Sequence, residues 1–261
     1  MPNSHSRGVI LVFPTAEAMA RQAAASFVAH AQAAIAARGR FNVVLSGGTT
    51  PRLIFSVLAG SEFAPQVEWA RVHFFWGDER PVPPSDHDSN FRLAHEYLLQ
   101  PLGIAPENIH RIEGELPPAE AAARYDRHLT DFFGTAPRRF DLIHLGLGED
   151  GHTASLFPYT AALDETEAKV VANEVPQRGT TRLTFTAALI NAARAVEFFV
   201  TGANKAKVLR EVLMGREQKY HYPSQMICPA DGTLTWFVTA DAAAYLPADM
   251  TKPAAGCAPP N

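Results

Sequence analysis

The stretch GLGEDGHTASLFP, residues 146–158, follows the apolar run DLIHL and places a histidine two residues after an aspartate. Asp150 is close enough in the chain to orient the ring of His152, and an imidazole that titrates near neutral pH is suited to taking a proton from water. We therefore interpret His152 as a candidate general base and Asp150 as its partner. His144 lies inside the apolar run itself, and we expect it in the core.

The same stretch also contains the spacing G-x-G-x-x-G, which binds dinucleotides when a strand precedes it and a helix follows. Its chemistry argues against that interpretation. Glu149 and Asp150 would repel the pyrophosphate that the backbone N–H groups must attract. Pro158 would stop a long helix soon after the loop. A catalytic loop without a nucleotide cofactor is the better interpretation.

Two further loops have the residues of an anion site. In SGGTTPR, Gly47 and Gly48 allow close approach of the backbone, Thr49 can donate from its hydroxyl, and the helix expected next directs its positive end at the loop. The loop lacks the lysine of a P-loop, so it does not imply a nucleoside triphosphate. Lys205 in TGANKAK lies at a helix start, where a bound anion would explain a cation. A tight turn and a solvated helix start remain the structural alternatives.

The loop GDERPVP places Asp78, Glu79 and Arg80 in succession at the end of a predicted strand. Arg80 could hold a phosphate or polarise a carbonyl, and a salt-bridged loop is the alternative. We predict no metal and no cofactor, since the sequence has no H-E-x-x-H and no paired Cys/His spacing, and SDHDSN is too isolated to be a ligand set. A serine nucleophile is unsupported because G-x-S-x-G is absent.

Each of these loops follows an apolar run, and such runs alternate with helical patterns along the chain. The predicted strands are residues 9–13, 41–46, 72–79, 109–112, 140–147, 195–202 and 234–239. The predicted helices are residues 15–39, 52–60, 89–102, 119–133 and 204–215. Thr15 and Ser89 are the expected N-caps of the first and third of these helices.

This alternation predicts a three-layer, Rossmann-like α/β fold with a mainly parallel sheet and helices on both faces. Functional sites of such folds lie beyond the carboxyl ends of the strands. Residues 169–186 are interpreted as an antiparallel segment added to the sheet. No linker or repeat divides the chain, so we expect a single domain over residues 1–261, with a surface or mobile tail from about Pro247.

The composition is that of a globular protein, with 47% apolar and 19% charged residues. A net charge of -4 argues against general binding to nucleic acid or anionic membrane, and no apolar stretch is long enough to span a bilayer. Cys228 and Cys257 have no metal-ligand spacing, and no signal peptide is recognised, so we expect a reducing, cytoplasmic setting. A monomer and a homodimer both fit the sequence.

Taken together, the blocks LSGGTTP, FFWGDERPVP, DSNFRLAHEYLL, DLIHLGLGEDGHTASLFP and TGANKAK resemble the sugar-phosphate family that contains 6-phosphogluconolactonase and glucosamine-6-phosphate deaminase. The resemblance covers nearly the whole chain. Deaminases look like DGHIAFNEP in the fourth block, where a glutamate before the proline assists ring opening. Phe157 stands in that place here and cannot relay a proton. GDERPVP and GHTASLFP are similar to the lactonase forms.

The resemblance therefore implies hydrolysis of 6-phospho-D-glucono-1,5-lactone to 6-phospho-D-gluconate in the oxidative pentose phosphate pathway. A δ-lactone is an activated ester, which water and one base can open. On this hypothesis His152 deprotonates water and Asp150 orients it. A basic group such as Arg80, next to Asp78, holds the oxyanion or the substrate.

The substrate's phosphate would lie among Gly47, Gly48, Thr49 and Lys205, and the family similarity adds Arg182 of TTRLTF. The sequence leaves open whether Arg80 serves the phosphate or the carbonyl, and whether His87 points into the site. A deaminase or isomerase and a non-catalytic sugar-phosphate sensor remain the alternative functions.

Overall fold

The computed structural model describes residues 8–253 of the 261-residue chain. The strands are β1 (Val9–Phe13), β2 (Phe41–Leu45), β3 (Val72–Trp76), β4 (Asp78–Glu79), β5 (Ile109–His110), β6 (Leu142–Gly146), β7 (Val170–Val175), β8 (Thr180–Phe185), β9 (Ala195–Val200), β10 (Thr233–Thr239) and β11 (Lys252–Pro253). The α-helices are α1 (Ala16–Arg38), α2 (Thr49–Leu58), α3 (Asn90–Ala94), α4 (Pro118–Phe133), α5 (Ala187–Asn191) and α6 (Ala206–Met214). A π-helical turn, His95–Leu99, continues α3.

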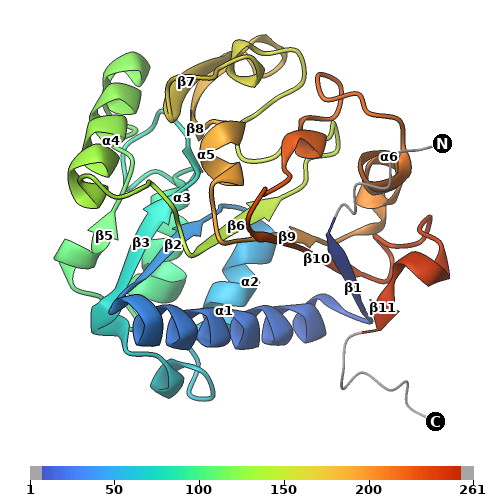
Figure 1. The fold of residues 1–261 in the computed structure, drawn as a ribbon, viewed down its shortest axis with the longest axis horizontal. Coiled ribbons are helices and arrows are strands. Elements are labelled where there is room, and N and C mark those ends of the chain that lie inside the picture. Colours follow the sequence, from blue (N-terminus) through green and yellow to red (C-terminus); the bar gives the residue numbers. More distant parts are fainter. Residues whose placement is uncertain (1–7, 254–261) are drawn as a thin grey trace.

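The main sheet has eight strands in the order β11-β1-β10-β9-β6-β2-β3-β5, and every pair is parallel. Its central strands are buried on both faces, as expected when helices cover a parallel sheet. Figure 1 shows α1 and α2 along one face and α4, α5 and α6 on the other. The predicted three-layer, Rossmann-like α/β fold is confirmed.

Local sequence explains where the helices begin and end. The Thr15 side chain accepts from the N–H of Ala18 at the start of α1, and Gly39 ends this helix in the left-handed conformation. Ser89 caps α3 by accepting from the N–H of Arg92. Both predicted N-caps are therefore found in the structure.

The chain order places the predicted loops together. From β2 the chain proceeds outward to β3 and β5, and then returns to the other side of β2 through β6, β9 and β10. The boundary between β2 and β6 is thus the point where strand order reverses, the usual location of ligand sites in open parallel sheets. The loops after β9, β6, β2 and β3 leave four adjacent strands at the same edge.

A separate three-stranded sheet, in the order β4-β8-β7, lies over this edge. Residues 169–186 form the antiparallel hairpin that was predicted, but its addition to the main sheet was wrong. The hairpin pairs instead with β4, whose Asp78 lies opposite Thr184. The predicted strand 72–79 is correspondingly split at Gly77, with β3 in one sheet and β4 in the other. One hydrophobic cluster includes buried residues of both sheets, among them Val44 and Leu183.

Of the predicted tail, residues 248–250 form a 3₁₀ turn and β11 pairs with β1. The remainder of the tail, with Cys257, lies outside the described residues. Within residues 8–253, no helix is both long enough and apolar enough to cross a membrane.

Candidate active site

A cavity of about 340 Å³ lies at the carboxyl ends of β2, β3, β6 and β9. Six of the residues predicted from the sequence line it: Gly47, Asp78, Arg80, His152, Arg182 and Lys205. They come from four loops and from β4 and β8 of the small sheet, so residues far apart in the chain converge on one space. The cavity is in the size range of small-molecule sites, which begins at about 300 Å³.

His152 is held by Asp150 at the cavity wall. The Oδ1 atom of Asp150 lies 2.5 Å from Nδ1 of the imidazole and also accepts from the backbone N–H of His152 at 3.2 Å. A carboxylate only accepts hydrogen bonds, so Nδ1 carries the proton and Nε2 is left with its lone pair. Burial raises the pKa of Asp150, but the hydrogen bonds and charge of His152 outweigh it and lower this pKa to about 2. Asp150 is thus a carboxylate at neutral pH.

Gly148 makes room for this pair. A Cβ atom at position 148 would lie 2.0 Å from Nδ1 of His152 and 2.7 Å from Oδ1 of Asp150. The N–H of Gly148 donates to the carbonyl of His152 at 2.8 Å, which closes the loop. On its other side the imidazole stacks on Phe157, with ring centroids 4.1 Å apart. The glycine and the aromatic ring together fix the orientation of His152.

Asp78 is a second, more deeply buried carboxylate of the site, with 8% of its surface exposed. Its Oδ2 accepts from the Ser155 hydroxyl at 2.8 Å, and its Oδ1 accepts from the Asn90 amide at 3.2 Å. These two donors fix the position of the carboxyl group. Asp78 therefore contributes a fixed negative charge to a wall that otherwise carries cations.

The neighbouring Glu79 does not line the cavity but holds the loop beside it in place. Its carboxylate accepts from the N–H groups of Arg80, Asn90 and Phe91 at 2.7–2.8 Å and from the Ser89 hydroxyl at 3.1 Å. Burial raises the pKa of Glu79, and the three backbone N–H groups oppose that rise. The Glu79 side chain ties the start of α3 to the turn that presents Arg80.

Four cations line the cavity, and one of them was missed by sequence reasoning. Arg80 donates from Nη1 to the carbonyl of Asp88, and Arg182 donates to Thr180 Oγ1 at 3.0 Å. Burial lowers the pKa of Lys205, and Glu149, 3.9 Å away, opposes that decrease. The missed cation is Arg178, in the turn between β7 and β8. From sequence alone, a basic residue of a binding site cannot be distinguished from any other basic residue in a hairpin turn.

The predicted anion loop reaches the cavity only in part. Gly47 lines it, and a Cβ atom there would lie 1.7 Å from Oδ1 of Asn90, so only glycine fits against α3. Gly48 (φ 107°) precedes α2, and Thr49 is the first residue of that helix. Neither Gly48 nor Thr49 is among the lining residues of the cavity.

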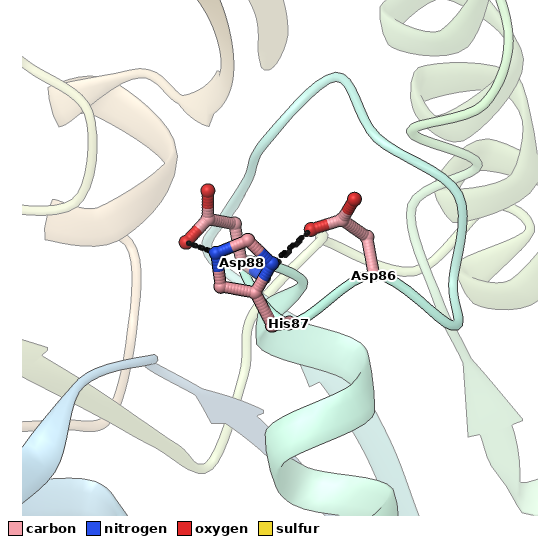
Figure 2. Close-up of side chains that lie close together, drawn as sticks. All are labelled: Asp86, His87 and Asp88. Atoms are coloured by element: carbon pink, nitrogen blue, oxygen red, sulfur yellow. Dashed lines mark hydrogen bonds and ion pairs between the residues drawn. The ribbon is translucent and has the colours of Figure 1, made fainter.

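His87 does not line the cavity either. Figure 2 shows its ring between Asp86 and Asp88, which lie 3.2 Å and 3.4 Å from its two nitrogens. Among residues 8–253, these three are the one group with the ligand types and spacing for a metal ion. The His87 side chain is 82% exposed, and its carboxylate neighbours already pair with it. This loop provides no enclosed metal site.

A larger hollow of about 1260 Å³ is lined by Asp150, the partner of His152, but has no lining residue in common with the smaller cavity. Its wall includes Tyr159 and His221, which hydrogen-bond to each other at 3.0 Å. The smaller cavity is the candidate active site because it alone of the two is lined by His152 and by the four cations.

Comparison with known proteins identifies the architecture. Residues 14–236 match the family described as glucosamine-6-phosphate isomerases/6-phosphogluconolactonase. The chain belongs to this family. It is 38% identical over 236 residues to a 6-phosphogluconolactonase of Aggregatibacter actinomycetemcomitans, covering 90% of this chain and 99% of the relative. A Nostoc 6-phosphogluconolactonase is 42% identical over 217 residues, covering 82% and 88%.

A solved structure of this family, the 6-phosphogluconolactonase from Trypanosoma cruzi, superposes with a TM-score of 0.81 at 26% identity. The match covers 92% of this chain and 97% of that one. The family resemblance inferred from the five sequence blocks is therefore confirmed. In this chain, Phe157 stacks against His152.

Proposed function

We propose that this chain hydrolyses 6-phospho-D-glucono-1,5-lactone to 6-phospho-D-gluconate, with water activated by His152. The observation that carries the proposal is the Asp150–His152 pair at the wall of a cavity lined by four cations. The relatives at 38% and 42% identity are named 6-phosphogluconolactonases, which supports the same substrate here.

In the proposed reaction, Nε2 of His152 takes a proton from water as the water oxygen bonds to the lactone carbonyl carbon. The carbonyl oxygen becomes an oxyanion, and a guanidinium group such as that of Arg80 stabilises it. The bond from the carbonyl carbon to the ring oxygen then breaks, and the imidazolium returns the proton to that oxygen. Asp150 keeps Nδ1 protonated and stabilises the imidazolium. The products are the hydroxy acid, which ionises, and the regenerated base.

The substrate's phosphate is assigned to Arg182 and Lys205, with the backbone of the Gly47–Thr49 loop as a further contributor. Arg182 lies in β8 of the small sheet and Lys205 in the 3₁₀ turn after β9 of the main sheet. Each is partly withdrawn from water, so their charges are screened less than those of exposed groups. Binding the phosphate far from the reacting carbon would hold the carbonyl against His152. Asp78 would orient the cations around it.

A deaminase or isomerase is the second candidate function, and Phe157 argues against it. Ring opening of an amino sugar requires an acid beside the histidine, whereas the phenyl ring stacked there has no ionisable group. A non-catalytic sensor would bind the product without turnover. A cytoplasmic location, a monomeric or homodimeric state and a single domain remain predictions.

One assay separates the three functions. Purified protein is supplied with 6-phosphogluconolactone, and lactone loss is compared with buffer alone, because the lactone also hydrolyses spontaneously. Glucosamine 6-phosphate is supplied in parallel, and ammonia release is measured. We expect lactone loss above the buffer rate and no ammonia. Lactone loss equal to that in buffer would reject the lactonase, and ammonia release would support the deaminase.

A further inference from the structure

A third cavity, of about 480 Å³, lies at the opposite edge of the main sheet from the candidate active site. Its lining includes Arg40, Asp141 and Arg194, which immediately precede β2, β6 and β9. These three strands are neighbours in the sheet. The cavity therefore lies at the amino ends of strands that present the candidate active site at their carboxyl ends.

Positive charge dominates this arginine cavity. Four guanidinium groups and one carboxylate line it: Arg38, Arg40, Arg139, Arg194 and Asp141. The cavity thus has three more positive than negative charges, in a chain whose net charge is -4. A concave wall with charge of one sign concentrates counter-ions of the other sign, so the expected ligand is an anion.

Asp141 forms ion pairs with two of the four arginines. Its Oδ1 lies 2.8 Å from Nη2 of Arg38 and 3.4 Å from Nε of Arg194. Its Oδ2 accepts from the N–H of Asn42 at 2.8 Å. The carboxylate is 5% exposed and already has these three partners, so it is not available to balance further cations.

The other two arginines, Arg40 and Arg139, do not pair with Asp141. The guanidinium of Arg40 lies over the ring of Phe132, 4.5 Å from its centroid, and has no carboxylate partner among residues 8–253. Arg139 donates from Nη2 to the carbonyl of Asp231 at 2.6 Å. Its Nε is buried without a hydrogen-bond partner in the described part of the chain. Neither guanidinium therefore pairs with a carboxylate within residues 8–253.

Asn42 indicates a hydrogen-bond donor on the ligand, because an amide oxygen only accepts. Its side chain lines the cavity and is 5% exposed, and Oδ1 has no hydrogen-bond partner among the described residues. Buried polar atoms are nearly always satisfied. Phe133 and Pro137 add an apolar part to the wall. The volume is again in the range of small-molecule sites, about 300–1,000 Å³.

We propose that the arginine cavity binds a small phosphate-bearing anion with more than one negative charge. Guanidinium groups fit phosphate better than other anion-binding side chains do, because their planar N–H pairs match two phosphate oxygens. Arg40 and Arg139 are the principal cations for the phosphate. The Oδ1 of Asn42, unpaired within residues 8–253, only accepts and so requires an O–H or N–H group elsewhere on the ligand. The site is separate from the substrate cavity and does not depend on the proposed lactonase activity.

Pyrophosphate is the first probe, and its binding is measured by titration calorimetry at low ionic strength. The protein carries Lys205→Gln, so that the active-site cavity contributes less to the signal. We expect one pyrophosphate per chain, with binding that weakens as salt is added. Adding Arg40→Gln and Arg139→Gln should weaken binding at least about tenfold. Arg127→Gln, which removes the same charge from an exposed position on α4, should change it by less than about twofold.

ATP as a second probe distinguishes the kinds of phosphate ligand. Tighter binding than pyrophosphate would support an organic phosphate that uses the apolar wall, and equal binding would support a ligand recognised through its phosphates alone. No binding of either probe would overturn the proposal, as would equal affinity in the Arg40→Gln/Arg139→Gln protein. If that double variant does not fold, Arg40→Gln alone serves, since Arg40 packs on the Phe132 ring and has no ion pair in residues 8–253.

Discussion

Nδ1 of His152 and Oδ1 of Asp150 lie 2.5 Å apart, and this contact places the proton of a neutral imidazole on Nδ1. Replacing Asp150 with Asn removes the charge but keeps the side-chain size. We expect kcat for lactone hydrolysis to fall about 10–100-fold, because the orientation of the ring and the charge that stabilises the imidazolium are lost. His152→Ala should lower kcat more, by about 10²–10⁴-fold. Steady-state kinetics and a thermal melt of each variant provide the comparison.

Equal activity of His152→Ala and the parent protein would show that His152 is not the general base. A loss of activity with a lowered melting temperature would instead indicate that the loop has collapsed. His152→Asn is the companion variant, because it retains polarity without a basic nitrogen.

Gly148 is predicted to be needed for activity because a larger residue would leave no room for the His152 ring. Its substitution by Ala places a methyl group 2.0 Å from Nδ1 of His152, so the imidazole must move away from Asp150. Displacing a catalytic group by about 1 Å reduces rates on the order of 10²-fold. Gly146→Ala is the matched comparison, since a Cβ atom there meets no atom within 4 Å. Similar kcat values for the two variants would contradict this prediction.

Lys205 and Arg182 are expected to act in binding more than in chemistry. Lys205→Gln and Arg182→Gln should each raise KM about tenfold or more, since a charge-assisted hydrogen bond to a phosphate contributes about 1.5–3 kcal/mol. A smaller decrease in kcat is expected, because His152 and Asp150 are unchanged. The same measurements on a lactone without phosphate should show little difference between parent and variants. A decrease in kcat without a change in KM would argue against the phosphate assignment.

The pH dependence of stability is predicted from Glu197, which lies far from the proposed chemistry. Glu197 is fully buried in β9 next to His144 of β6, and its Oε1 accepts from the Ser26 hydroxyl at 2.5 Å. Burial raises the pKa of Glu197 to about 7, and the Ser26 hydrogen bond opposes that rise. His144 has a pKa lowered to about 3, first by burial and then by His30, so it is neutral here.

The folded pKa of Glu197 is above its ordinary value of 4.5, so its contribution to stability is complete below pH 4.5 and is lost as pH rises through about 7. The loss should be on the order of 1–3 kcal/mol. Glu197→Gln, which cannot ionise, should flatten the decrease between pH 5 and pH 8. Urea unfolding across this range is the measurement. A parallel decrease in parent and variant would assign the pH dependence to other groups.

The strand-end clusters could be predicted from the sequence because each follows an apolar run, and parallel strands bring their carboxyl ends to one edge. That argument placed Gly47, Asp78, His152 and Lys205 around one cavity. It could not find Arg178, because the position of the β7–β8 hairpin depends on pairing with a two-residue strand. In the sequence, those two residues are indistinguishable from the end of β3.

The anion loop SGGTTPR stays a prediction. The helix α2 begins at Thr49, earlier than predicted, and the backbone N–H groups of its first turn have no partner within the helix. The arginine cavity could not be predicted from the sequence, since its residues are scattered between position 38 and position 194. Their proximity depends on the order of β9, β6 and β2 in the sheet.

The single residue Gly77 separates two strands that belong to different sheets. His152 and Gly47 are carried by the main sheet, whereas Arg182 and Arg178 are carried by the small one, with Asp78 at the joint. The proposed base and two of the four cations of the cavity thus stand on two separate supports. The β7–β8 hairpin can be lengthened, shortened or recharged to suit a different ligand while the histidine keeps its place, so selectivity for the substrate can change independently of the chemistry.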